Sequence, residues 1–515
     1  MAPPSTRSGN QRKLILVVVD SLRSDMLLRT IEAGDAPTFK KLLDRGELVP
    51  DCVSSFPSVT PVCTSEITTG VRPDRHHIPG MNWYRRAEER YVEYGSSFEA
   101  TRMFGLFRSL YDTVYNLNMG HLNHETLTCF ERLGDAGLRT ACTPFLIYRG
   151  RTRHEVGLEG LLKAFASAAK FHHAVWGPDE LFYGELYSSR KVECKPTLAR
   201  PATRDAYSAC VGRDLVEHDL YDFMLFSLPD NDYYSHRDGP ERTQESIALA
   251  DDALAELVDA HGGIDRFLEA NGVIVVADHA QSQVTKPLPL AEGLGGHWEV
   301  LRPNAELDRA RHEIAVGPSG RGAGVWILAE PGAEHDRLAS QVRRYVNQNL
   351  TEQVELIAWL ECGGEQAAVR RGDLELRFAP GDDVVDRRGA GWSVTGEPAT
   401  LAATVGDGRF ESADFPDALA RLWAALRNPN AADLLLSLAP DWECVDWGGI
   451  THTPGGSHGS LRAEDSLGAL LTVGLEGERP ERERWAISDV AGLIDTHFGI
   501  ESEAAASAAV TSAAR

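Results

Sequence analysis

The chain has 515 residues, a length that suggests roughly two to four domains or one large core with an insertion. Its 52 Lys and Arg residues and 76 Asp and Glu residues leave a formal charge of −24. A surface this acidic repels nucleic-acid polymers and anionic membrane surfaces. The longest aliphatic run covers only 14–19, whereas a membrane span needs ~18 apolar residues. We therefore expect neither a nucleic-acid polymer nor a membrane as partner.

The N-terminus and the cysteines give a prediction of location. No apolar segment followed by a small-residue cleavage site is visible near Met1, so we see no secretory signal. The eight cysteines contain no Cys-x-x-Cys pair and are too sparse for a disulfide scaffold. We predict reduced thiols in a cytoplasmic protein, although a mature chain after signal removal would look similar.

Short apolar runs alternate with helical patterns along the chain. Each run is continuously apolar, as expected of a strand buried on both faces, and four are clear: 13–19, 222–228, 272–277 and 433–438. The run 467–473 is a weaker candidate. Residues 36–45 and 242–261 have helical spacing with suitable ends. This alternation predicts a doubly wound α/β/α sheet, with the strands that end at Asp20, Asp230, Ala277 and Leu438 in one sheet.

Composition divides the chain into segments. We expect disorder in 1–11, the main α/β core in 12–287 with excursions above the sheet over 81–195, and a low-complexity tail in 501–515. Turn signals crowd 288–417, which we interpret as an inserted α+β cap, and the core resumes over 418–500. The Gly-rich stretch 317–324 (GPSGRGAG) fits neither the dinucleotide nor the P-loop pattern, so we interpret it as a turn.

Metal-ligand residue types stand directly after the predicted strands. They are Asp20, Asp232 with His236, Asp278 with His279, and His458 in a Gly-rich turn. Ligands of open α/β sheets bind beyond the carboxyl ends of the strands, and clustered Asp and His suit Zn²⁺ or Mn²⁺. A lone Asp at a strand end is more often a helix cap. Four such places together favour a site for two divalent metal ions.

A nucleophile candidate lies in 56–70 (FPSVTPVCTSEITTG). Pro57 and Pro61 bracket Thr60, which we place at the N-cap of a helix over 61–69. A helix N-terminus favours an anion beside the hydroxyl. Because a hydroxyl is a poor nucleophile without a base or metal, the neighbouring metal-ligand residues strengthen this interpretation over a simple capping role.

These ordered motifs resemble the alkaline phosphatase superfamily, and within it the nucleotide pyrophosphatase/phosphodiesterase type. The matching elements are VVVDSLRSD, the Thr60 segment, DYYSHRDGP, ADHAQS and GGSHGS, which span most of the chain. The resemblance implies one metal held by Asp20, Thr60, Asp278 and His279. It implies a second metal held by Asp232, His236 and His458. It further implies a small-molecule phosphate ester, such as a nucleotide, as substrate.

Two positions depart from that family. The family has an Asn three residues after the nucleophile that contacts a phosphoryl oxygen, whereas this chain has Cys63. The family has Gly after the Asp-His pair, whereas this chain has Ala280. The first departure puts the substrate class in doubt. Arg23, Cys63, Trp83 and Tyr84 are our candidates for contact with substrate, with ion pairing for Arg23 and core packing for the two aromatic residues as the alternatives.

Three functions compete at this point. The first is a two-metal hydrolase of a phosphodiester, pyrophosphate or phosphomonoester that forms a phosphothreonine. The second is another enzyme on the same scaffold, a phosphonate hydrolase of the phosphonoacetate hydrolase type or a mutase-like isomerase, although the mutases use Ser instead of Thr. The third is a metal-binding pseudoenzyme, which only Cys63 favours. The segment 56–65 lacks the C/S-x-P-x-R motif of sulfatases, which argues against that activity.

Overall fold

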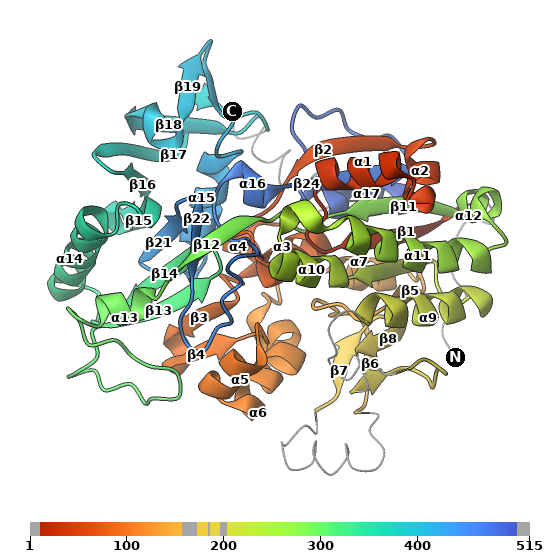
Figure 1. Cartoon of the computed structure of the whole chain (residues 1–515), viewed down its shortest axis with the longest axis horizontal. Helices are drawn as coiled ribbons and strands as arrows, with labels where there is room; N and C mark the ends of the chain where they lie inside the picture. The colour runs from red at the N-terminus through yellow and green to blue at the C-terminus, as the bar shows by residue number, and fades with distance from the viewer. Residues whose placement is uncertain (1–10, 157–172, 184–185, 196–202, 502–515) are drawn as a thin grey trace.

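The computed structural model describes residues 11–156, 173–183, 186–195 and 203–501. The predicted disorder of 1–11 and the tail 501–515 lie almost wholly outside these residues. Two large sheets lie side by side in the molecule (Figure 1). One buried hydrophobic cluster contains residues of both sheets, so they share a continuous core. Within the described ranges, no helix is both long and apolar enough to span a membrane.

The first sheet contains three of the four predicted buried strands. β1 (Lys13–Val19) pairs in parallel with β10 (Phe223–Leu228) on one side and β11 (Asn271–Val276) on the other, and β10 pairs in parallel with β5 (Thr140–Cys142). The weaker candidate, β24 (Leu467–Val473), runs antiparallel to β11 and is followed by β2 (Glu47–Val53) at the edge. The strand order is β2 (Glu47–Val53), β24 (Leu467–Val473), β11 (Asn271–Val276), β1 (Lys13–Val19), β10 (Phe223–Leu228), β5 (Thr140–Cys142), β8 (Glu180–Tyr183) and β9 (Tyr187–Ser188).

Both faces of this sheet are covered, as its continuous apolar strands predict. In β1, Leu14, Leu16 and Val18 enter one buried cluster and the alternate residues Ile15, Val17 and Val19 enter another. One face packs against α3 (Thr60–Thr69), α7 (Cys129–Asp135) and α17 (Asp489–Phe498). The other packs against α1 (Ser24–Ala33), α2 (Pro37–Leu43), α9 (Arg204–Glu217), α11 (Gln244–Ala260) and α12 (Ile264–Ala270). The α/β/α sandwich is confirmed.

The second sheet is built mainly of antiparallel pairs. It contains β21 (Leu434–Leu438), so the prediction that this strand joins the first sheet is wrong. A continuous apolar run indicates that both faces of a strand are buried, but it does not indicate which sheet the strand joins. α14 (Ala333–Asn349) and α15 (Ala418–Arg427) pack on β15. The other strands are β13 (Ile314–Ser319), β14 (Gly322–Ile327), β15 (Val354–Glu361), β16 (Gln366–Arg371), β17 (Leu374–Val385), β18 (Gly391–Gly396), β19 (Ala403–Gly406) and β20 (Arg409–Ser412).

The segment 81–195 differs partly from the predicted excursions. β3 (Asn82–Arg85) and β4 (Arg90–Glu93) form a separate hairpin, and α5 (Phe98–Phe104) and α6 (Leu106–Tyr111) follow it. β5, β8 and β9, however, extend the first sheet. These strands have only two to four residues, too short to produce a recognisable pattern.

A small three-stranded sheet links the loops that carry predicted ligands. β12 (Ser282–Leu288) begins three residues after His279, and β23 (Gly456–Ser457) ends directly before His458. These two strands pair antiparallel, and β12 also pairs with β22 (Asp441–Cys444). The pairing brings two loops that are far apart in sequence to one place.

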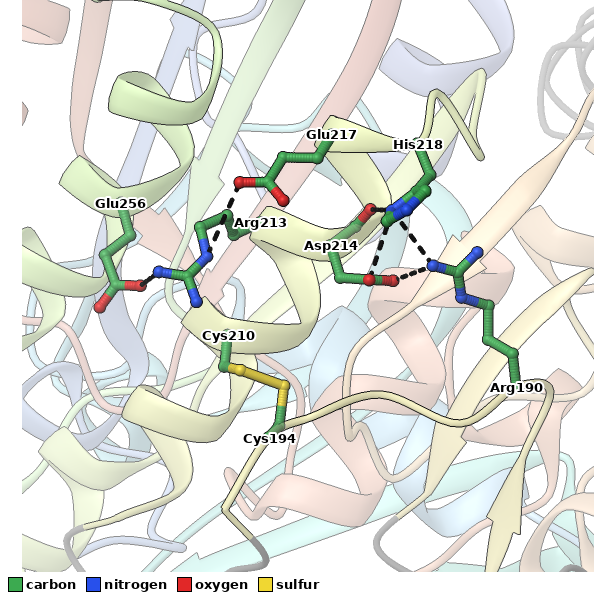
Figure 2. Close-up of a disulfide and its surroundings, with 8 residues drawn as sticks. All are labelled: Arg190, Cys194, Cys210, Arg213, Asp214, Glu217, His218 and Glu256. Atoms are coloured by element: carbon green, nitrogen blue, oxygen red, sulfur yellow. Dashed lines mark hydrogen bonds and ion pairs between the residues drawn. A yellow bond between two sulfur atoms is a disulfide. The ribbon is translucent and has the colours of Figure 1, made fainter.

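Cys194 and Cys210 form a disulfide that ties the segment after β9 to helix α9 (Figure 2). The ion pair of Arg190 with Asp214 makes a second link between the same segments. The prediction of reduced thiols is therefore wrong for this pair, and the cysteines no longer support a cytoplasmic location, since disulfides persist in oxidising compartments. A sparse cysteine count does not reveal two residues that folding brings together.

Candidate active site

The predicted ligands converge at the carboxyl edge of the first sheet. Asp20 follows β1 directly, and Asp278 and His279 come two and three residues after Val276, the last residue of β11. α10 (Asp230–Asp238) begins two residues after β10, and its 3.6-residue period places Asp232 and His236 on one face. The backbone N–H of Asp20 donates to the carbonyl of Leu228 (3.1 Å), which aligns the ends of β1 and β10.

Two sets of three side chains each hold their ligand atoms within 4.8 Å of one another. The first set is Asp20, Asp278 and His279, and the second is Asp232, His279 and His458. His236 adjoins the second set, because its Nε2 lies 3.4 Å from Asp232 Oδ2. The structure therefore brings together all six predicted Asp and His ligands, with the His279 ring between the two sets.

Backbone carbonyls orient His458, which belongs to the second set, and His236, which adjoins it. His458 Nδ1 donates to the carbonyl of Ser58 (2.7 Å), and His236 Nδ1 donates to the carbonyl of Gly456 (2.7 Å). A carbonyl can only accept, so the proton is on Nδ1 and the lone pair is on Nε2 in both rings. Each Nε2 lies within 3.8 Å of an Asp232 carboxylate oxygen. This is the orientation in which histidine binds a metal.

Burial and crowded like charge dominate the electrostatics. Burial, together with the neighbouring carboxylates, raises the pKa of Asp20, and burial with the charge of Asp232 raises the pKa of Asp278 to about 6. Burial lowers the pKa of His279 and of His458 to about 4, so both imidazoles are neutral at pH 7. Three carboxylates and neutral imidazoles in one buried place favour a cation.

The donor set fits divalent metal ions. Asp20 Oδ1 and Asp278 Oδ2 are buried and accept no hydrogen bond from any described group. Buried carboxylate oxygens without donors are costly, and a cation would satisfy them. Carboxylate oxygen with imidazole nitrogen is the ligand set of Zn²⁺ and also suits Mn²⁺.

Thr60 lies beside this cluster. It is the first residue of α3, and the residue before it, Val59, is the N-cap, so the predicted capping role of Thr60 is wrong. Its Oγ1 is 3.3 Å from His279 Nε2. One turn on, the Thr64 hydroxyl donates to the Thr60 carbonyl (2.6 Å). The Thr60 hydroxyl is therefore directed to the predicted ligands instead of to the helix backbone.

Two polar residues that the sequence did not reveal bind the predicted ligands. The Ser21 hydroxyl donates to Asp232 Oδ1 (2.8 Å), and its backbone N–H donates to Asp278 Oδ1 (3.2 Å). The fully buried Gln281 donates from Nε2 to Ser21 Oγ (3.1 Å) and to Asp232 Oδ1. Ser21 and Gln281 adjoin ligand motifs, the only signal that distinguishes them in the sequence.

His452 also belongs to the surroundings of the site. Its ring stacks on His236, with centroids 3.9 Å apart and an angle of 27°. The buried Glu443 holds it, accepting hydrogen bonds from its backbone N–H (2.9 Å) and its Nδ1. His452 therefore supports the ring of His236 by stacking on it.

The four candidates for substrate contact each have other partners in the structure. The Arg23 guanidinium pairs with Asp25 (2.7 Å) and Glu241 (2.8 Å), the alternative that the sequence left open. Cys63 has no exposed surface, and burial raises the pKa of its thiol. Trp83 and Tyr84 belong to the shared hydrophobic core, and the Trp83 ring meets His121 edge-on. These contacts favour core packing over a pocket wall for both aromatic residues.

Comparison with known proteins agrees with this geometry. Residues 14–461 match the sequence profile of the family described as type I phosphodiesterase / nucleotide pyrophosphatase. No curated protein matches the chain. Among solved structures, the chain is similar in fold to the phosphonoacetate hydrolase from Sinorhizobium meliloti 1021, crystallised with phosphonoformate. The TM-score is 0.53 at 14% identity, and the match covers 95% of this chain and 96% of that one.

The family profile covers most of the chain, including all the predicted ligands and Thr60. Its members are metal-dependent hydrolases of phosphoric esters within the alkaline phosphatase superfamily. The chain therefore belongs to the type I phosphodiesterase/nucleotide pyrophosphatase family.

Proposed function

We propose that the protein is a two-metal hydrolase that cleaves a phosphodiester, pyrophosphate or phosphomonoester bond through a covalent phosphothreonine on Thr60. The single observation that carries the proposal is the position of the Thr60 hydroxyl, 3.3 Å from His279 Nε2, the ring that belongs to both ligand sets. A small-molecule ester such as a nucleotide is the expected substrate class.

The residues divide into two groups around the reaction centre. Asp20, Asp278, His279 and the Thr60 oxygen would hold one divalent ion, and Asp232, His236 and His458 would hold the other. Such ions supply Lewis-acid stabilisation of charge on the attacking, leaving and non-bridging oxygens. Zn²⁺ is the expected ion, and Mn²⁺ also suits these ligands.

The chain's own part in the reaction follows from Thr60. Its hydroxyl gives up a proton to solvent and the oxygen attacks phosphorus in line, while the bond from phosphorus to the leaving oxygen breaks on the opposite side and the alcohol or phosphate departs. Water then attacks the phosphothreonine, again in line, and releases phosphate or a phosphomonoester. Two in-line displacements give net retention of configuration at phosphorus. Ser21 and Gln281 hold the Asp232 carboxylate in place throughout.

Hydrolysis of model substrates tests the proposal. The purified protein, supplied with Zn²⁺ or Mn²⁺, is assayed on bis-p-nitrophenyl phosphate, p-nitrophenyl phosphate and phosphonoacetate, and a chiral phosphorothioate diester reports the stereochemical outcome. We expect hydrolysis of an ester with retention. Inversion would exclude the covalent route, and no hydrolysis of any ester with either metal would contradict the proposal.

A phosphonate hydrolase is the second candidate. It is supported by the similarity in fold to a phosphonoacetate hydrolase and by Cys63 in place of the family's Asn, since a buried thiol cannot supply the usual amide donor to a phosphoryl oxygen. Preference for phosphonoacetate over both esters in the same assay would favour this candidate.

A further inference from the structure

The Gly-rich turn between β13 and β14, residues Ser319–Gly322, lies directly against the backbone of His458. The N–H of Arg321 donates to the carbonyl of His458 (2.6 Å). A Cβ added at Gly320 would lie 2.2 Å from that same carbonyl oxygen, and a Cβ added at Gly459 would lie 2.0 Å from the carbonyl oxygen of Ser319. Only glycine allows this approach of backbone to backbone.

The side chain of Arg321 extends the contact into the interior. It is 1% exposed and pairs with Asp465, which is 0% exposed, at 2.7 Å between Nη1 and Oδ1. Ser282, which opens β12 three residues after His279, donates from Oγ to the same Asp465 oxygen (2.5 Å) and accepts from Arg321. The turn of the second sheet thereby reaches the loop that follows the first ligand set.

Asp465 joins the loops of both ligand sets. Its Oδ2 accepts the N–H of Ser460, two residues after His458 (3.0 Å), and its backbone carbonyl accepts the N–H of Ala280, directly after His279 (3.0 Å). Above this connection the His279 and His458 rings stack, with centroids 3.8 Å apart and an angle of 18°. The relative position of the two rings therefore depends on Asp465 and its partner.

We propose that the Ser319–Gly322 turn and the Arg321–Asp465 ion pair together set the separation of the two metal subsites. The inference rests on the proposed two-metal function. Two-metal phosphoryl transfer requires ions ~3.5–4 Å apart, so small movements of His458 relative to His279 matter. A fully buried ion pair is a poor source of stability because of its desolvation cost, but its fixed hydrogen-bond geometry restrains the loops that it joins. Arg321 and Asp465 are thus positioning residues supplied outside the ligand motifs.

The first test compares two glycines with the same backbone strain. Gly320 and Gly372 have φ of +61° and +59°, but a Cβ at Gly372 meets nothing within 4 Å. Gly320→Ala and Gly372→Ala are each loaded with Mn²⁺, and ion stoichiometry, affinity and the electron paramagnetic resonance signal of the exchange-coupled manganese pair are measured. We expect Gly320→Ala to bind the second ion at least tenfold more weakly and to alter or lose the coupled signal. Gly372→Ala should match the wild type.

The second test removes the paired N–H donors of the Arg321 guanidinium without introducing a clash. Arg321→Lys keeps the charge but loses the paired donors. Its matched control is Arg149→Lys, because Arg149 is also buried, pairs with Glu131 (3.0 Å) and donates to backbone carbonyls away from the site. We expect weaker second-ion binding and a changed coupled signal only in Arg321→Lys, and a lower melting temperature in both variants.

The outcomes separate this inference from the proposed function. Wild-type protein that binds fewer than two Mn²⁺ ions would contradict the proposed function itself. Wild-type protein with a normal coupled pair, together with Gly320→Ala and Arg321→Lys variants that keep its stoichiometry, affinity and signal, would overturn the positioning role alone. In that case the turn only stabilises the fold. Because Gly320→Ala and Arg321→Lys disturb the same contact in different ways, one remains informative if the other fails to fold.

Discussion

The two large sheets contribute to the candidate site in different ways. The mainly parallel first sheet supplies side chains, since Asp20 and the Asp278–His279 pair stand at the ends of adjacent strands and α10 follows β10. The antiparallel second sheet supplies a hairpin turn, whose Arg321 backbone and guanidinium hold the loops of His458 and His279. Parallel strand ends align several residues at one edge, whereas a tight hairpin turn can pack its backbone against a loop. The first sheet thus supplies the candidate reactive side chains, and the second sheet adds contacts that position their loops.

The largest expected effect concerns the nucleophile at the edge of the first sheet. Thr60→Ala should lower kcat by about 10³-fold or more, because it removes the attacking hydroxyl. The variant should still bind metal, since the six Asp and His ligands remain. Thr60→Ser should retain partial activity. Thr64→Ala is the control, because its hydroxyl lies one turn along the same helix and donates to the Thr60 carbonyl. Near-normal turnover of Thr60→Ala would contradict the assignment.

Removal of one ligand charge should cost metal without unfolding the sheet. Asp278→Asn keeps the oxygen that accepts hydrogen bonds from Ser21 and His279 but removes one of three crowded carboxylate charges. We expect the bound metal to fall from two ions to about one. The metal-free variant should melt at or above the temperature of metal-free wild type, because like-charge repulsion is relieved. Metal analysis and thermal unfolding measure both, and full occupancy would count against Asp278 as a ligand.

Removal of the Cys194–Cys210 disulfide tests whether the attachment of helix α9 to the first sheet can be weakened without affecting the site. Cys194 and Cys210 are 16 residues apart, and closing a loop of about 15 residues is worth about 3 kcal/mol in the chain-entropy model. The double variant Cys194→Ser/Cys210→Ser should therefore lose about 2–3 kcal/mol of unfolding free energy in urea, with kcat within about twofold of wild type. Wild type in a reducing agent should behave in the same way. A tenfold loss of kcat would show that α9 controls the site.

The smallest expected effect lies in the second sheet. His335, near the start of α14, hydrogen-bonds to Asp433 (3.0 Å), and this bond raises the pKa of His335. The folded state then holds the proton more tightly than the unfolded chain. The stabilisation is complete below about pH 6.5 and is lost as the pH rises through the raised pKa. The ion pair is partly exposed, so the effect should stay within about 1 kcal/mol.

His335→Gln is the variant that isolates this ion pair. The unfolding free energies of wild type and variant should converge as the pH increases from 6 to 9. A difference that is constant over this range would mean that packing, and not the charge, is what the histidine contributes.

Local patterns in the sequence predicted much of the first sheet and all the ligand types. Strands β1, β10 and β11 are continuous apolar runs, which only burial on both faces explains. The Asp and His residues that follow these strands were sufficient to predict candidate ligands at one edge of the sheet. The segment that contains the candidate nucleophile Thr60 was recognised from its motif. The start of its helix was predicted one residue too late, because α3 begins at Thr60.

Tertiary structure alone decided what lies far apart in sequence. The apolar run of β21 is compatible with either sheet, and only strand pairing assigns it to the second. The Cys194–Cys210 disulfide depends on α9 and the segment after β9 meeting in space. Arg321 is separated from Asp465 by 144 positions, so no local pattern connects them. Sequence by itself determined which residues are candidates to bind metal and to react, since that is a property of side-chain chemistry at strand ends. The folded structure determined how those residues are held, because that depends on contacts between separate layers.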